Sequence, residues 1–245
     1  MLSWLTGAIL VFARVGSALA FMPGFGEAFI PVRVRLMMAL TISLAIYPAS
    51  PLGLLDIPSL PRFAAILILE VTIGIWIAMM ARAIMAALHF AGYQIGMISG
   101  LSNALAPDGA SFQGGTIFAS ALLLAGIAAI FGSDFHHVIL AGFLTSYEVL
   151  PPGDYLAGDI AEQAVKAVGN TLFLGVSLAA PFFLAGILIN AAMGMANRMM
   201  PTLPVFFVAG PILIGFSLII LVVAMPAIVF GLLGSMGDWF ATFTF

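Results

Sequence analysis

The chain has 245 residues, of which 63% are hydrophobic and only 7% are Asp, Glu, Lys or Arg, and its formal net charge is −3. Roughly a quarter of the residues of a soluble domain are charged, and a domain of this size still exposes much of its surface, so a water-soluble globule is excluded. Scattered Lys and Arg residues form no basic patch, which excludes nucleic-acid binding. The chain has no cysteine and therefore no thiolate metal site or disulfide. These features predict an all-α integral membrane protein.

Apolar blocks separated by Pro, Gly and charged residues predict the helices. In chain order they lie at about 2–22, 34–55, 63–101, 112–132, 135–150, 164–197 and 203–236. About 20 helical residues cross a bilayer core of ~30 Å, so most blocks can span. The block at 135–150 is too short and is expected to be re-entrant or buried among partners. The first block is read as a membrane helix because residues 1–13 lack the Lys or Arg of a signal peptide.

Two blocks are longer than a bilayer requires. The block at 63–101 contains no proline, and as one helix it would be almost 60 Å long at ~1.5 Å per residue. It is expected to tilt and kink, or to stand partly outside the lipid and be surrounded by protein. The block at 164–197 has the same excess, and Pro181 is expected to break or bend it. Residues 148–162 are expected to form an acidic connection.

Three charged residues lie well inside apolar blocks, away from the block ends, and each needs a partner, because ionisable groups in membrane helices face protein or water. These are Arg14, Glu70 and Arg82. Glu70 and Arg82 are twelve residues apart, which places them about 120° apart on one helix, so they cannot pair along one face. The pattern predicts pairing between helices or between subunits. A proton relay is the less favoured alternative, because the ionisable groups are scattered.

Small residues define two predicted helix-packing faces. Gly92, Gly96 and Gly100 recur every four residues and form a flat stripe that lets another backbone approach. A second small and polar face comprises Gly186, Asn190, Gly194, Asn197 and Arg198. Both faces are expected to contact protein rather than lipid.

Residues 102–115 are rich in small, turn-forming types and interrupt two long apolar blocks. Irregular backbone at membrane depth survives only when protein or a water-filled cavity surrounds it. A pore-lining or plugging loop is therefore predicted, with an ordinary exposed connection as the alternative.

Asp134, His136 and His137 combine residue types found in metal sites. Adjacent histidines on a helix point about 100° apart, and the chain has no H-E-x-x-H pattern. An interfacial loop is predicted here, with no metal, no cofactor and no catalytic group.

The order and spacing of several motifs resemble the FliR/SctT family of type III protein export over nearly the whole chain. The motifs are Phe12-Ala13-Arg14-Val15, Pro31–Leu36, the glycine ladder from Gly92 to Leu101 followed by Ser102, Tyr147–Pro151, and Asn197-Arg198-Met199-Met200-Pro201 followed by Phe206-Phe207-Val208 and Gly210-Pro211. The last group is the strongest match.

The resemblance implies a non-enzymatic subunit of a flagellar export gate, a multi-pass protein of the bacterial inner membrane in the flagellar basal body. It implies assembly with FliP and FliQ into a pore that stands largely above the membrane plane, with FlhB attached, FlhA nearby and unfolded flagellar proteins in transit. One membrane-embedded domain, 1–245, would comprise a FliP-like part at 1–150 and a FliQ-like helical hairpin at 163–245.

In that family the loop after the glycine ladder plugs the closed channel, and here it corresponds to residues 102–115. The resemblance assigns plug roles to Asn103, Leu105, Pro107, Asp108 and Phe112. Asn103 and Ala106 stand where aromatic residues are expected, so Leu105 and Phe112 are predicted to make the apolar contacts.

Two other functions remain as alternatives. An ion-coupled secondary transporter would use Glu70, Arg82 and His89, although no inverted repeat is evident. An intramembrane enzyme built on Asp134, His136 and His137 is the weakest reading, because no nucleophile or ligand set accompanies them.

Overall fold

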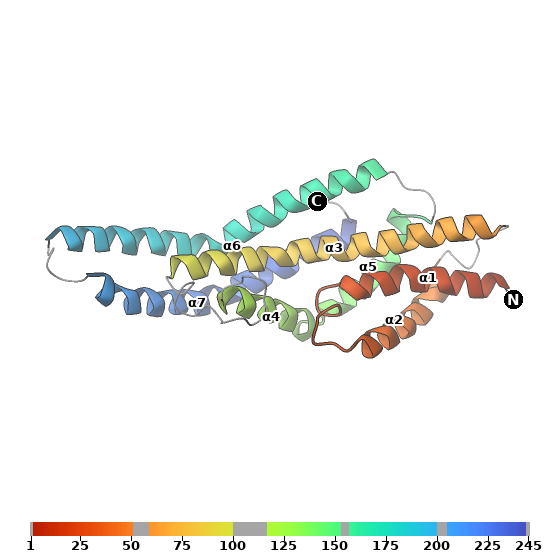
Figure 1. The fold of residues 1–245 in the computed structure, drawn as a ribbon, viewed down its shortest axis with the longest axis horizontal. Helices are drawn as coiled ribbons and strands as arrows, with labels where there is room; N and C mark the ends of the chain where they lie inside the picture. The colour runs from red at the N-terminus through yellow and green to blue at the C-terminus, as the bar shows by residue number, and fades with distance from the viewer. Residues whose placement is uncertain (1, 51–58, 100–116, 153–156, 200–204, 244–245) are drawn as a thin grey trace. The chain divides into compact units, whose positions relative to one another are not determined.

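A computed structural model describes residues 2–50, 59–99, 117–152, 157–199 and 205–243 (Figure 1). The elements are α1 (Leu2–Phe21), α2 (Val32–Ile46), the 3₁₀ turn η1 (Tyr47–Ala49), α3 (Leu60–Ile98), α4 (Ile117–Gly132), α5 (Phe135–Val149), α6 (Ala157–Met199) and α7 (Val205–Thr242). Every element in these ranges is helical, which confirms the predicted all-α fold.

Within the described ranges, five helical segments are long and apolar enough to cross a membrane singly. They are Trp4–Phe21, Val32–Ala49, Leu60–Ile98, Ile160–Met199 and Gly210–Ala241. The bent pair formed by α4 and α5 counts as a sixth span when taken together. The chain is therefore a multi-pass membrane protein.

The helices α3, α6 and α7 are much longer than a bilayer core is thick. They contain 39, 43 and 38 residues, or about 58, 65 and 57 Å at ~1.5 Å per residue, against a core of ~30 Å. The long helix predicted for the block at 63–101 is therefore present as α3. About half of each of these helices needs surroundings other than the hydrocarbon core.

The structure corrects one expectation about α6. The helix begins at Ala157, inside the stretch 148–162 that was expected to be an acidic connection. Lys166 Nζ lies 2.8 Å from Glu162 Oε1, four residues earlier, and this ion pair supports the first turns of the helix. The acidic composition of this stretch therefore did not indicate a loop. Of the two effects expected of Pro181, a break or a bend, the break is absent, because the helix continues through this residue although proline removes one backbone hydrogen bond.

The chain forms two compact units that interleave along the sequence. Unit 1 comprises Met1–Ile84, Ile130–Gly169 and Ser235–Phe245, and unit 2 comprises Met85–Ala129 and Asn170–Gly234. These boundaries concern packing within the chain and do not test the division into FliP-like and FliQ-like parts, which stays a prediction.

In unit 1, α5 packs one face onto its own chain. Its buried residues follow helical spacing: Ile139, Gly142, Phe143, Ser146 and Tyr147. A Cβ at Gly142 would lie 2.5 Å from the Phe240 ring, so the glycine admits that aromatic side chain. The short helix predicted to be re-entrant or partner-buried is therefore partly covered by unit 1 itself.

Aromatic side chains from distant parts of the sequence complete the core of unit 1. The Trp76 and Trp239 rings lie 5.9 Å apart, and Trp239 meets Phe240 edge to face at 4.9 Å. All three residues are buried. Burial of such large apolar groups is a main stabilising contribution for a core.

In unit 2, small residues let helices approach closely. A Cβ at Gly92 would overlap the backbone of Ala119 in α4, and a Cβ at Gly126 would lie 2.5 Å from the Leu88 side chain of α3. Without side chains at these points, α3 and α4 pack closely against each other. The glycine stripe thus meets a helix of the same chain at Gly92.

The apolar spans differ in how much of them the chain itself covers. The chain itself buries 44% of the most apolar stretch of α1 and of α3. It buries 28% of the corresponding stretch of α6 and only 11% of that of α7. Large side chains such as Leu188, Val223 and Phe230 are at least 70% exposed. Lipid or other proteins must cover these surfaces, because water would not solvate them.

A Gly92→Ala substitution is expected to destabilise unit 2 because the added methyl group meets the Ala119 backbone. Overpacking of this kind costs about 1–3 kcal/mol, which would lower the midpoint of thermal unfolding in detergent. The matched control is Gly234→Ala, which has open space and is expected to be neutral or stabilising by up to about 1 kcal/mol. Equal midpoints for the two variants would contradict the packing.

Candidate functional site

The most polar buried cluster of the described residues surrounds Arg14 of α1 in unit 1. Arg14 Nε donates to Glu70 Oε2 at 2.6 Å and Arg14 Nη2 to Glu70 Oε1 at 3.0 Å, so the pair is bidentate. Arg14 Nη1 donates to the backbone oxygen of Ser146 at 3.0 Å and to its Oγ at 3.2 Å. Arg14 Nη2 also donates to the Leu150 backbone oxygen at 3.0 Å. Each of the guanidinium's five N–H groups has an acceptor.

The Tyr147 ring covers the same guanidinium, with Arg14 Cζ 3.9 Å from the ring centroid. Arg14 and Glu70 are both fully buried. A buried ion pair offsets its desolvation only with good geometry and additional hydrogen bonds, and this cluster has both. Through these contacts, Arg14 connects α1 with α3 and with the C-terminal end of α5.

A second group of charges holds the turn that follows α1. Arg82 donates from Nε to the Phe21 oxygen and lies 3.7 Å from the carboxylate of Glu27. Arg35 donates to the backbone oxygen of Glu27 at 2.8 Å. These side chains are partly exposed, so the ion pair contributes little by itself, but two arginines together fix the path of residues 21–30.

These contacts identify the partners that the sequence required for Arg14, Glu70 and Arg82. All three residues have a partner of opposite charge on another segment of the same chain, so none of them requires a partner subunit. Glu70 and Arg82 do not pair with each other, as their spacing predicted. The sequence did not identify Ser146, Tyr147 and Leu150 as partners of Arg14, although Tyr147 and Leu150 belong to a motif that it singled out.

The predicted packing faces differ in what covers them. Gly92 and Gly96 are buried. On α6, Asn190 Nδ2 donates to the Gly186 oxygen one turn earlier at 2.8 Å, whereas a Cβ placed on Gly194 would have no atom within 4 Å. Asn197 and Arg198 are exposed. The face from Asn190 to Arg198 is therefore open, and its role as an interface stays a prediction.

The predicted plug lies outside the described residues. This applies to Asn103, Leu105, Pro107, Asp108 and Phe112, and to Gly100 at the end of the glycine stripe. Their roles stay predictions.

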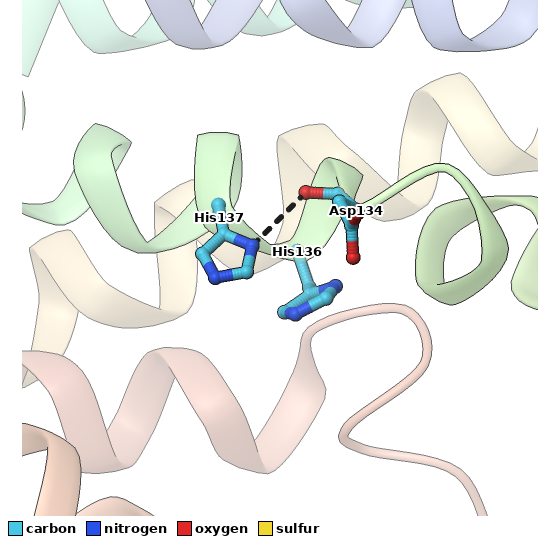
Figure 2. Close-up of side chains that lie close together, drawn as sticks. All are labelled: Asp134, His136 and His137. Atoms are coloured by element: carbon cyan, nitrogen blue, oxygen red, sulfur yellow. Dashed lines mark hydrogen bonds between the residues drawn. The ribbon is translucent and has the colours of Figure 1, made fainter.

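The polar break between α4 and α5 is more organised than its sequence indicated. One ligand atom each from Asp134, His136 and His137 lies within 4.8 Å of the other two (Figure 2). The His136 and His137 ring centroids are 4.2 Å apart, although adjacent helical residues point about 100° apart. The directions in which the two side chains leave the helix therefore did not predict that their rings would lie side by side.

Fold and site together define an all-α, multi-pass membrane protein with long helices, a buried ion-pair cluster and extensive uncovered apolar surface. The model of the family described as bacterial export proteins, family 1, matches residues 5–238. The chain belongs to this family.

Three relatives named flagellar biosynthetic protein FliR illustrate the similarity. The protein of Caulobacter vibrioides is 36% identical over 218 residues, covering 87% of each chain. That of Escherichia coli K12 is 29% identical over 229 residues, covering 93% of this chain and 87% of the relative. That of Aquifex aeolicus is 24% identical over 240 residues, covering 97% and 92%. The resemblance inferred from the motifs is confirmed, and the transporter alternative gains no support.

Removing one partner of the Arg14–Glu70 pair is expected to destabilise the chain far more than removing both. Arg14→Met or Glu70→Met strands a buried charge, which costs about 3–5 kcal/mol. The double variant leaves no uncompensated charge. Thermal midpoints in detergent for the four proteins give the coupling between the two residues. Additive single and double effects would contradict a coupled pair.

Proposed function

We propose that this chain is a core subunit of the export gate of a flagellar type III secretion apparatus in the bacterial inner membrane. The observation that carries the proposal is similarity to flagellar biosynthetic FliR proteins along 87–97% of the chain. Its partners would be FliP and FliQ in the pore complex, with FlhB and FlhA associated. Unfolded flagellar proteins would pass through the assembled channel.

The exposed end of α6 supports assembly with other subunits. Met195 and Met199 are 64% and 83% exposed, and Asn197 and Arg198 are exposed beside them. Lipid suits the methionines but not the amide or the guanidinium, which face protein or water when they lie at membrane depth. A partner subunit with apolar and polar groups suits all four.

Helix length supports the same proposal. About 30 Å of each of α3, α6 and α7 lies beyond what a bilayer core covers, and each of these helices exposes large apolar side chains. Neighbouring subunits that surround these helices would cover the length that the bilayer core does not reach. Such an arrangement fits a pore complex that stands partly above the membrane plane.

As a gate, the chain would close the export channel at rest and open it during export, rather than catalyse a reaction. Its flexible methionines, clustered at Met193, Met195, Met199 and Met200, can repack against changing neighbours because the side chain is unbranched and polarizable. Residues 102–115 are proposed as the plug, with Leu105 and Phe112 supplying its apolar contacts. Energy for export would come from other components.

A Gly194→Phe substitution is expected to block assembly without unfolding the chain. Gly194 has open space around it, so the bulky ring fits the isolated subunit but obstructs a partner helix. We expect at least a tenfold loss of FliP and FliQ that co-purify with the chain, together with loss of swimming. Gly158→Phe is the matched control on the same helix, also with open space, and is expected to assemble.

Normal assembly of Gly194→Phe would contradict the interface on α6 but not the gate itself. The gate proposal fails if mass analysis of the native complex in detergent finds this chain without FliP and FliQ.

Deleting residues 103–112 is expected to open the channel at rest. Cells that carry the deletion should leak small ions and dyes across the inner membrane, while the assembled complex remains isolable. The full-length chain expressed at the same level is the control. An intact permeability barrier after the deletion would contradict the plug assignment.

A further inference from the structure

The break between α4 and α5 places three metal-binding residue types at the start of a helix in unit 1. Asp134 has a left-handed backbone with φ 57° and ψ 17°, a conformation that aspartate tolerates better than most residues. Asp134 immediately precedes α5, whose first turn contains His136 and His137. Figure 2 shows a ring nitrogen of His136 turned toward the Asp134 carboxylate.

The groups in this cluster are poorly satisfied by the rest of the described chain. His136 Nδ1 is buried and has no hydrogen-bond partner there. Asp134 immediately precedes α5, yet its carboxylate makes no capping hydrogen bond to the helix. The buried His136 nitrogen and the uncapped Asp134 carboxylate are therefore both available to a ligand that binds nitrogen and oxygen together.

Neighbouring groups hold the two imidazoles in place. The Phe131 ring lies 5.8 Å from the His136 ring and is tilted by 30° to it. His137 Nδ1 lies 3.3 Å from the backbone oxygen of Asp134, the dashed line in Figure 2. These contacts keep both rings beside the carboxylate before any ion binds.

We propose that Asp134, His136 and His137 bind a divalent transition metal ion, with Zn²⁺ as the ion that the donor set suits best. Two imidazole nitrogens and one carboxylate oxygen are a ligand set of zinc sites that leave a fourth position to water. Ligands about 2.0–2.2 Å from zinc are about 3.3–3.5 Å apart in a tetrahedron. The present limit of 4.8 Å therefore closes with small rotations of these partly exposed side chains.

The ion acts as a brace at the break between the two helices. It joins the residue before α5 to the first turn of that helix and gives His136 the partner that it lacks. The positive end of the α5 dipole disfavours a cation at this position, and the Asp134 carboxylate offsets that effect. This site does not depend on the proposed export-gate function. Either proposal can therefore be contradicted by experiment while the other stands.

The test is titration of the full-length chain, purified in detergent with a tag that contains no histidine, with ZnCl₂ against a chromophoric chelator. We expect one zinc ion per chain, with affinity at least tenfold weaker in His136→Ala and His137→Ala and also reduced in Asp134→Asn. His89→Ala is the matched control, since His89 is the third histidine of the chain, and it should bind like the parent protein. Lower pH should weaken binding, because protonated imidazole does not coordinate.

Two results would overturn the proposal. One is the absence of stoichiometric zinc binding by the folded parent chain. The other is unchanged affinity in the His136→Ala/His137→Ala double variant. Should an alanine variant fail to fold, His136→Gln and His137→Gln keep a polar group of similar size and carry the same expectation.

Discussion

Burying Arg14 in an apolar membrane helix requires an acceptor for each of its N–H groups, and this requirement draws three helices together. Glu70 of α3 supplies the charge, and Ser146 and Leu150 from α5 and its end supply oxygens. A guanidinium left without them would carry a large desolvation penalty. The ion pair therefore selects one arrangement of α1, α3 and α5 among the many that apolar packing alone would permit.

Unit 2 is held together on a different basis. Gly92 and Gly126 permit close contact of α3 with α4, and the gain there is van der Waals packing rather than ion pairing. Most of the apolar stretch of α7 is not covered by the chain itself. A chain that pairs its buried charges internally but leaves its apolar helices open is suited to assembly, because partners can cover those helices without disturbing the buried charges.

Several elements of this fold could be predicted from residue pattern because each depends on local chemistry. The absence of proline from the block at 63–101 predicted one long helix, and α3 extends from Leu60 to Ile98. The short block at 135–150 became α5 within one residue of its expected end. The start of α6 was missed because Glu162 and Lys166 pair along the helix, so charged residues marked a helix rather than a loop.

By itself the sequence determined the membrane class, most of the helix blocks, the family and the need of Arg14, Glu70 and Arg82 for partners, because each follows from composition, spacing or motif order. Only the tertiary structure decided which residues those partners are. Residues 14, 70 and 146 are far apart along the chain, and spacing within one helix says nothing about which helices adjoin. The same holds for Asp134, His136 and His137, whose side chains converge at the 77° bend between α4 and α5, where Asp134 has a left-handed backbone.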